Sequence, residues 1–96
     1  METPSSGLHK IDLRDQTELT IGRSPENDLQ LSYPTISRNH ARIRRIGDGE
    51  EYVIEDLSSS NGTLLNDEFL EPGTLYTLYP GSTIKIGPIR LIFAPE

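Results

Sequence analysis

Closely spaced glycines and prolines are the feature that most constrains the fold, because they interrupt the apolar runs of the chain before a helix can form. No helical period of apolar residues is sustained between these turn signals. The short runs that remain are typical of strands, and they lie within residues 7–13, 18–22, 27–31, 40–46, 51–57, 62–66, 74–78, 82–87 and 89–94. Many short strands joined by close turns are typical of a sandwich. The sequence therefore predicts an all-β fold, an antiparallel β-sandwich of two sheets.

The run HARIRRI shows the alternation of a half-buried strand. Ala41 and Ile43 fall on one face of such a strand. His40, Arg42 and Arg44 fall on the other face, because successive side chains of a strand point in opposite directions. We therefore expect a half-buried strand, with Ala41 and Ile43 on one face and the polar residues on the other.

The length of 96 residues allows one domain with a modest core. We expect residues 1–6 to form a loose tail and residues 7–96 to form the single domain. No run is long enough to span a membrane, and the N-terminus lacks the pattern of a signal peptide. The absence of cysteine excludes disulfides and thiolate metal sites and fits a reducing compartment, so we expect a cytoplasmic protein.

The charge is negative overall but unevenly distributed. A net charge of −6 argues against nucleic-acid binding, which needs a basic face. Four of the nine basic residues nevertheless lie within eight positions: Arg38, Arg42, Arg44 and Arg45. A local positive patch on a negative domain favours a small anionic target. A solvated strand face is the alternative for Arg44 and Arg45.

Three polar loops carry the candidate functional residues, at 22–27, 32–39 and 57–63. Loops of a sandwich gather at its two ends, where the rigid frame holds their side chains. If all three lie at one end, they bring together five polar residues: Arg23, Ser37, Arg38, Ser60 and Asn61. A guanidinium presents paired donors that match two phosphate oxygens, and hydroxyls and loop N–H groups can satisfy the others. The constellation therefore indicates a phosphate site.

The order and spacing of these motifs carry more information than any one motif. The series TIGRSPENDLQL, ISRNHARI, VIEDLSSSNGTLLN and GSTIKIG, from about Thr20 to Phe93, closely resembles the forkhead-associated (FHA) domain family. The hallmark positions of that family are matched here by Gly22-Arg23, by Ser37 with His40 three residues later, and by Asn61-Gly62. The resemblance implies a two-sheet β-sandwich that binds phosphothreonine peptides through loops at one end.

The resemblance assigns five residues to phosphopeptide binding: Arg23, Ser37, Arg38, Ser60 and Asn61. In this assignment Arg23 pairs with the phosphate and Ser37 donates its hydroxyl to it. Arg38 touches the phosphate or the peptide backbone, Ser60 contacts the phosphothreonine, and Asn61 hydrogen-bonds the peptide main chain. Three further residues shape or brace the binding loops: Gly22, His40 and Gly62. The implied partner is a threonine-phosphorylated protein or peptide. No catalytic residue, metal, other cofactor, nucleic acid or membrane insertion is implied.

Three positions depart from the family pattern. Asp67 stands where many members have glycine, so the hairpin turn around it can differ. Ser82 stands where aspartate is usual, which concerns turn chemistry and not the site. Thr35, two residues before Ser37, occupies a position that in some relatives reads the third residue after the phosphothreonine. Threonine leaves that preference open.

Two other functions compete with this interpretation. A small hydrolase would use Ser37 and His40 with Asp56 as the carboxylate, although residues three apart on a strand point to opposite faces. A phosphate-independent interaction scaffold would use another face of the sandwich, for example one that bears Tyr33, Tyr76 and Tyr79. A recognition domain usually brings another domain to a modified partner, so we expect this signalling module to belong to a larger protein.

Overall fold

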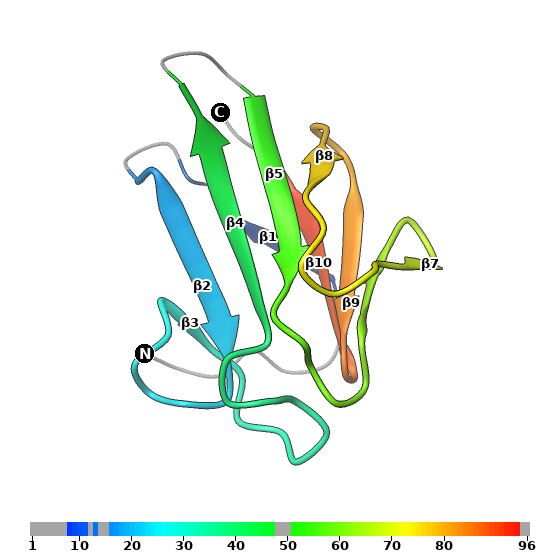
Figure 1. Ribbon diagram of the computed structural model, residues 1–96. Helices are drawn as coiled ribbons and strands as arrows, with labels where there is room; N and C mark the ends of the chain where they lie inside the picture. Colours follow the sequence, from blue (N-terminus) through cyan, green and yellow to red (C-terminus); the bar gives the residue numbers. More distant parts are fainter. Residues whose placement is uncertain (1–7, 12, 14–15, 48–50, 95–96) are drawn as a thin grey trace.

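The computed structural model describes residues 8–11, 13, 16–47 and 51–94 (Figure 1). The tail expected at residues 1–6 lies outside the described residues, so the domain limits stay a prediction. The described part contains ten strands: β1 (Leu8–Ile11), β2 (Glu18–Gly22), β3 (Leu29–Gln30), β4 (Ala41–Ile46), β5 (Glu51–Asp56), β6 (Thr63–Leu65), β7 (Glu68–Phe69), β8 (Tyr76–Leu78), β9 (Thr83–Ile86) and β10 (Ile89–Phe93). Among these residues there is no helix of the length and apolarity that crossing a membrane requires.

The strands form two five-stranded sheets that pack face to face (Figure 1). One sheet has the order β1-β10-β9-β6-β7, and the other has the order β3-β2-β4-β5-β8. Most neighbouring strands are antiparallel. However, β1 pairs in parallel with β10, and β2 pairs in parallel with β3. The predicted all-β sandwich of two sheets is confirmed, and its sheets are mixed.

The hairpin of β4 and β5 illustrates how alternation builds the sandwich. Ile43 lies opposite Ile54 in the register, and both side chains are fully buried. Arg42 lies opposite Glu55 on the other face, where the guanidinium and the carboxylate are 2.7 Å apart. Apolar residues therefore face the second sheet, and charged residues face solvent, as the period of two predicts.

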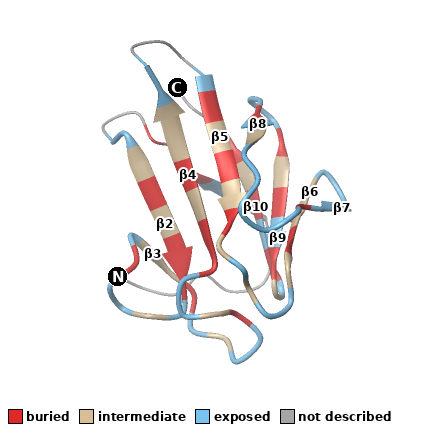
Figure 2. Ribbon diagram, viewed as in Figure 1, coloured by how far each residue is buried: buried red, intermediate tan, exposed pale blue. Residues whose placement is uncertain are grey.

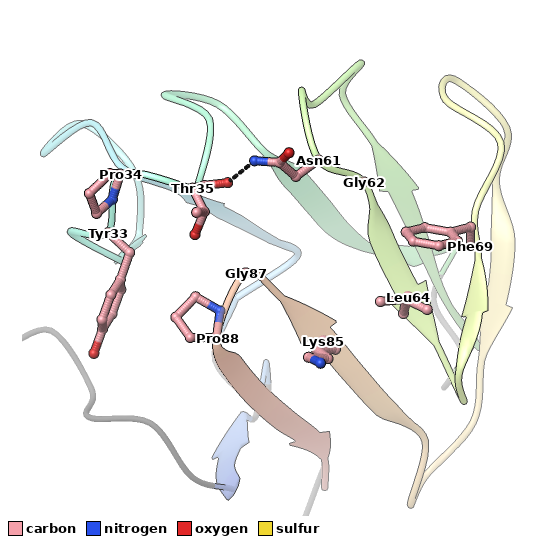
Figure 3. Close-up of a pocket in the computed structure, with 10 residues that line it drawn as sticks. All are labelled: Tyr33, Pro34, Thr35, Asn61, Gly62, Leu64, Phe69, Lys85, Gly87 and Pro88. Atoms are coloured by element: carbon pink, nitrogen blue, oxygen red, sulfur yellow. Dashed lines mark hydrogen bonds between the residues drawn. The ribbon is translucent and has the colours of Figure 1, made fainter.

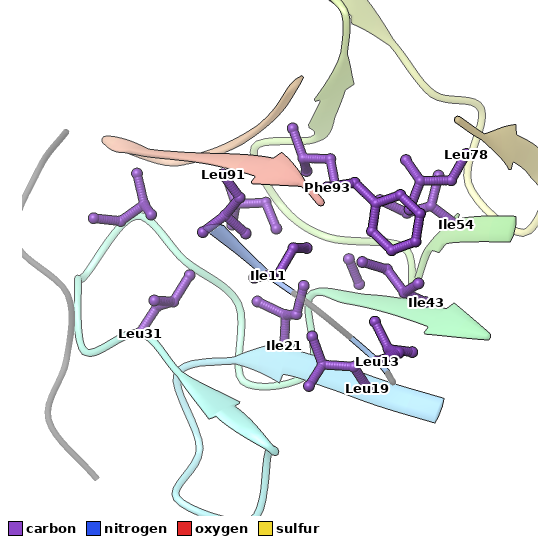
Figure 4. Close-up of a cluster of buried hydrophobic side chains, with 14 of the residues drawn as sticks. Ile11, Leu13, Leu19, Ile21, Leu31, Ile43, Ile54, Leu78, Leu91 and Phe93 are labelled. Carbon is purple, nitrogen blue, oxygen red and sulfur yellow. The ribbon is translucent and has the colours of Figure 1, made fainter. Parts of the chain in front are cut away.

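One hydrophobic core fills the space between the sheets (Figures 2 and 4). Its fully buried apolar side chains come from both sheets and from the loops: Leu13, Ile21, Leu31, Ile36, Ile43, Ile54, Ile84, Ile86, Ile89, Leu91 and Phe93. The rings of Tyr52 and Phe93 meet edge to face across the sandwich, with centroids 4.8 Å apart. Each buried Leu or Ile contributes about 1.5–3 kcal/mol relative to an exposed one. The core therefore gives the loops a rigid frame.

The strand β7 is the one that the apolar pattern does not predict. Glu68 and Phe69 are both exposed, and they pair with β6 at the edge of the sheet. A two-residue turn joins the strands, with Asn66 at φ 50° and Asp67 at φ 71°. Positive φ at both central positions is the geometry of a type I′ hairpin turn. Asp67 thus adopts the backbone conformation that favours glycine, and the hairpin forms despite this departure from the family pattern.

The three polar loops gather at one end of the sandwich, at the lower ends of β2, β4 and β5 in Figure 1. They comprise residues 23–28, 31–40 and 57–62. The turn between β9 and β10 lies at the same end (Figure 1). The prediction that the polar loops meet at one end is therefore confirmed.

Candidate functional site

Hydrogen bonds hold the first two loops against each other. The N–H of Arg23 donates to the carbonyl of Ser37 (2.9 Å), and the N–H of Ser24 donates to the carbonyl of Arg38 (3.2 Å). The side-chain amide of Asn27 donates to the carbonyls of Ser24 (3.0 Å) and Arg38 (2.7 Å). A buried polar group left without a partner costs about 1–3 kcal/mol, so these bonds fix the loop geometry. The two loops therefore behave as one unit.

Gly22 ends β2 and lies directly against the second loop. A Cβ at this position would lie 2.1 Å from the backbone carbonyl oxygen of Arg38 and 2.8 Å from the side-chain amide nitrogen of Asn27. Both distances are far below van der Waals contact, and any other residue would push the loops apart. Gly22 is therefore required by the close approach of two backbone segments.

His40 links the second and third loops from a fully buried position. Its Nδ1 accepts a hydrogen bond from the N–H of Ser37 (3.1 Å). Its Nε2 lies 2.8 Å from the carbonyl oxygen of Gly62. Because Nδ1 accepts a bond, the ring hydrogen is on Nε2, which donates to that carbonyl. A neutral imidazole therefore connects main-chain groups of two different loops.

The strand alternation alone does not determine the orientation of His40. In HARIRRI it places His40 on the face of Arg42 and Arg44, opposite Ala41 and Ile43. However, β4 begins only at Ala41, and the N–H of His40 donates to the carbonyl of Ile21 (2.8 Å) at the end of the loop. The strand period therefore does not extend to His40, and its ring turns inward between the loops.

The hydrogen bonds of Ser37 do not form the nucleophile pair considered from the sequence. The histidine ring bonds to the backbone of Ser37, whereas the Ser37 hydroxyl oxygen accepts the N–H of Ser60 (2.9 Å). The candidate carboxylate, Asp56, is buried and accepts from the hydroxyls of Ser59 and Thr63, both at 2.6 Å. Neither the serine nor the histidine has the partner that nucleophilic catalysis requires.

The hydrogen bonds of Asp56 hold the third loop in place, which was not evident from the sequence. Besides the two hydroxyls, this carboxylate accepts the N–H of Ser59 (3.1 Å). The Ser59 hydroxyl oxygen then accepts the N–H of Gly62 (3.0 Å). Aspartate and serine side chains often bond nearby backbone groups in turns, so their closeness at Asp56 and Ser59 could have indicated this arrangement.

Gly62 connects the third loop to the edge of the first sheet. Its φ is 88°, which favours glycine. A Cβ here would lie 2.9 Å from two ring atoms of Phe69, so that ring lies directly over the loop backbone. The backbone conformation therefore favours glycine, and any side chain here would displace the exposed ring of Phe69.

The Arg23 side chain is exposed, and one side of its guanidinium is fixed. Its Nε donates to the carbonyl of Ile36 (2.9 Å). The terminal nitrogens make no hydrogen bond within the part of the chain that the structure describes. Arg23 lines a hollow of about 320 Å³ together with Ser24, Pro25, Glu26 and Arg38. Two guanidinium groups beside one hollow favour a dianion such as phosphate.

The remaining candidate residues meet where the second and third loops touch. Because the Ser37 oxygen accepts the N–H of Ser60, its own hydrogen is available to a ligand. The side-chain amide of Asn61 donates to the carbonyl of Thr35 (2.8 Å), as Figure 3 shows. Within the described residues, the Asn61 side-chain oxygen and its second amide hydrogen make no hydrogen bond. The structure thus brings all five predicted binding residues to one end: Arg23, Ser37, Arg38, Ser60 and Asn61.

The arginines that cluster in the sequence do not form one patch. Arg42 lies on the outer face of β4 and pairs with Glu55 (2.7 Å) and Glu18 (3.4 Å). The hydrogen bond that the Arg42 guanidinium donates to the Glu55 carboxylate raises the pKa of that guanidinium above its ordinary value. Arg44 lies opposite Glu18 in the register. Of these residues, Arg38 alone joins the loop end, so the positive patch is smaller than the sequence suggested.

The three tyrosines of the scaffold alternative do not share a surface. Tyr33 follows β3, at one edge of the second sheet, and Tyr76 lies on β8, at the opposite edge. Both pack against the core, and the Tyr76 hydroxyl accepts the N–H of Glu71 (2.8 Å). Tyr79 is exposed and follows β8. These three tyrosines therefore do not form the single binding surface that the scaffold alternative requires.

The donors at the loop end suit an anionic ligand and not a metal ion. Guanidinium, hydroxyl and amide groups predominate there, and they donate hydrogen bonds to oxygen anions. The described residues contain no group of three or more His, Cys, Asp or Glu side chains that could hold a metal ion. The site is therefore a candidate for a phosphate group presented by a larger ligand.

Comparison with known proteins gives relatives of similar sequence. The oxoglutarate dehydrogenase inhibitor of Corynebacterium efficiens is 44% identical over 81 residues, which cover 84% of this chain and 54% of that protein. The glycogen accumulation regulator GarA of Mycolicibacterium smegmatis is 37% identical over 81 residues, which cover 84% of this chain and 48% of that protein. The chain therefore spans about half the length of these curated relatives.

Solved structures share the fold of this chain. The N-terminal FHA domain of Rad53p from S. cerevisiae, in complex with a phosphothreonine peptide, superimposes with a TM-score of 0.66 at 30% identity, covering 73% of this chain and 56% of that one. An FHA domain solved to analyse phosphothreonine-dependent interactions gives a TM-score of 0.69 at 30% identity, covering 79% of this chain and 74% of that one. The family model described as FHA domain matches residues 19–87. This chain belongs to the forkhead-associated domain family.

Proposed function

We propose that this chain is a module that binds a partner protein through a phosphorylated threonine. The observation that carries the proposal is the pairing of Arg23 and Arg38 beside one hollow, next to the loop junction at Ser37. The Ile36 carbonyl orients the Arg23 guanidinium, so its terminal nitrogens are directed before a ligand arrives. A phosphate dianion accepts charge-assisted bonds from such a fork, each about twice as strong as a bond between neutral groups.

The other residues of the site complete the recognition of a peptide. The Ser37 hydroxyl donates to a second phosphate oxygen, and Ser60 contacts the phosphothreonine beside it. Asn61 bonds the peptide main chain with the amide groups that its bond to Thr35 leaves available. Gly22, His40 and Gly62 support these contacts by holding the loops together, as their bonds and close contacts indicate.

The proposal extends to the kind of protein that contains this module. The relatives are named as an inhibitor and a regulator, which supports a binding role without catalysis. We propose that the chain is a non-catalytic recognition domain, that it works as part of a larger protein, and that it functions in the cytoplasm. The absence of cysteine supports a cytoplasmic location, because proteins of reducing compartments rarely contain disulfides.

Calorimetric titration with four matched peptides tests the proposed function. The peptides carry threonine, phosphothreonine, phosphoserine or glutamate at one position, and phosphothreonine is expected to bind most tightly. Its extra methyl group adds about 0.8 kcal/mol if it is buried, and its β-branch lowers the rotamer freedom lost on binding. Together these effects predict about tenfold weaker binding of phosphoserine. Glutamate has too few oxygens for Arg23, Ser37 and Ser60 at once, so it should not bind.

Equal affinity for all four peptides would contradict a phosphate-dependent function. Equal affinity for the two phosphopeptides would retain phosphate recognition but remove the selection for threonine.

The affinity for the phosphopeptide is expected to fall as the pH drops below about 6, because the phosphate dianion takes up a proton there. The arginines keep their charge over this range, so the loss arises from the ligand. If only the dianion binds, the affinity falls about tenfold for each further pH unit. Titrations between pH 8 and pH 5 measure this profile, and ³¹P NMR of the free peptide gives the pKa for comparison. A flat affinity profile over that range would contradict recognition of the dianion.

A further inference from the structure

A groove of about 530 Å³ lies beside the candidate site, on the outer face of the first sheet (Figure 3). In Figure 3, Asn61 lies at its upper rim, Tyr33 and Pro88 form one wall, and Leu64 and Phe69 form the other. Lys85 lies on β9 between the two walls. The groove is therefore mainly apolar, with one positive charge inside it.

The strand register shows that this groove is part of a longer row of side chains. Phe69 on β7 lies opposite Leu64 on β6, and Leu64 lies opposite Lys85 on β9. Lys85 in turn lies opposite Arg90 on β10. Residues directly opposite one another project from the same face of a sheet. The outer face thus carries one row across four strands, which we call the outer-face row: Phe69, Leu64, Lys85 and Arg90.

The apolar end of the outer-face row is unusually open. Phe69 has 67% of its surface exposed, on a short edge strand. Its ring lies over the backbone of Gly62 in the third loop, where a Cβ would approach within 2.9 Å. An exposed aromatic ring in an apolar groove is typical of a surface that contacts a partner. The ring therefore joins the sheet face to the loop that carries Asn61.

The other end of the row is positive on a negative chain. Lys85 and Arg90 are both exposed, whereas the net charge of the chain is −6. Neither side chain makes an ion pair with any residue in the described part of the structure. Neighbouring cations without a partner attract carboxylates and orient an approaching ligand.

We propose that the outer-face row binds the segment of the phosphorylated partner that flanks the phosphothreonine. A large apolar side chain of that segment packs on Leu64 and Phe69, and a carboxylate pairs with Lys85 and Arg90. The groove is continuous with the candidate site, because Asn61 and Thr35 line it and are joined by a hydrogen bond at the loop end. A peptide chain that leaves Asn61 therefore enters the groove directly.

This inference rests on the proposed function and adds a class of partner to it. The partner carries phosphothreonine together with an apolar and an acidic residue on the side that passes Asn61. The loop residue Thr35 does not supply this selection, since its side chain has neither charge nor a large apolar surface. The selection comes from strands outside the three loops.

A phosphopeptide library with fixed phosphothreonine and randomised flanks gives the first test. We expect enrichment of Leu, Ile, Met or Phe and of Asp or Glu on one side of the phosphothreonine. Phosphothreonine-dependent binding without this enrichment would overturn the inference and leave the proposed function intact. Binding that does not depend on phosphate would overturn both, so the two failures are distinguishable.

Charge reversal of the groove lysine gives the second test, and the chain provides a matched control. Arg44 lies on β4 of the other sheet, so Lys85→Glu and Arg44→Glu change the net charge equally at separate faces of the sandwich. Lys85→Glu is expected to weaken the binding of a phosphopeptide with acidic flanks about tenfold, and Arg44→Glu less than about twofold. A peptide with glycine flanks should bind both variants equally. Equal loss in the two variants would contradict the inference.

The apolar contact has its own pair of variants. Phe69 and Tyr79 each have 67% of their surface exposed, so Phe69→Ala and Tyr79→Ala remove similar exposed rings. Phe69→Ala is expected to lower the affinity for the peptide with an apolar flank about fivefold, and Tyr79→Ala is expected to leave that affinity unchanged. If Phe69→Ala weakened the glycine-flanked peptide by the same factor, the ring would act only through Gly62. That result would overturn the contact proposed here.

Discussion

Arg23→Ala is expected to abolish phosphopeptide binding and to leave the fold intact. The change removes the guanidinium fork that lines the hollow at the loop end. Hydrogen bonds to charged groups contribute about 1.5–3 kcal/mol each, so the loss of two predicts at least about a hundredfold weaker binding. The side chain is exposed and gives the fold one bond, from its Nε to the Ile36 carbonyl. The melting temperature should therefore change little.

Two variants make the Arg23 experiment specific. Arg23→Lys keeps the charge but loses the planar fork and the bond to Ile36, so it should recover only part of the affinity. Arg44→Ala removes an arginine from the outer face of β4, away from the loops, and should bind normally. Calorimetry gives the affinities, and thermal unfolding gives the stabilities. An affinity loss below about fivefold in Arg23→Ala, or a collapse of its stability, would contradict the assigned role.

His40→Ala is expected to show the reverse pattern, a large loss of stability. The change leaves the partly buried N–H of Ser37 and carbonyl of Gly62 without their bonds to the ring. Each unpaired group costs about 1–3 kcal/mol, and the empty space adds to that cost. We expect a loss of about 2–3 kcal/mol in the free energy of unfolding. For a domain of this size, such a loss lowers the melting temperature by roughly 10–20 °C.

Asn39→Ala is the matched control for His40→Ala. It changes the preceding residue of the same loop, which is exposed, and should leave the melting temperature unchanged. Urea unfolding of both variants measures the difference in free energy. Phosphopeptide affinity, measured well below the melting temperature, should fall in His40→Ala only as far as the loops loosen. A His40→Ala protein with normal stability would show that the two bonds do not brace the loops.

The strands were predictable because most of them have one buried face. Each of the nine apolar runs contains a strand in the structure. The exception, β7, has no buried residue: Glu68 and Phe69 are both exposed, so they give no alternation to detect. Its position follows from the turn at Asn66 and Asp67, whose positive φ the residue types alone do not establish. Alternation thus predicts buried strands well and exposed edge strands poorly.

The sequence predicted which residues form the site, but it did not predict the hydrogen bonds that join the loops. The spacing of the motifs identified the residues that meet at the loop end. It did not reveal that Asn27 joins two loops or that Asp56 shapes the third, because such bonds depend on which backbone groups come close in space. The inward orientation of His40 does not follow from strand alternation for a related reason, since the period of two applies only where the strand has begun. The outer-face row was not visible before the register between distant strands was known.

The hydrogen bonds that join the three loops determine whether the domain or the peptide loses more conformational entropy on association. Because the loops are already joined by groups of the chain itself, from Arg23 to Gly62, little backbone freedom remains in them to be lost. The ordering cost therefore falls mainly on the peptide, at about 1–2 kcal/mol for each residue whose backbone becomes fixed. Peptide residues that stiffen an extended chain, such as proline or β-branched residues near the phosphothreonine, lower that cost without contacting the protein. Preferences of this kind would arise from the stiffness of the ligand, and no pocket on the domain would account for them.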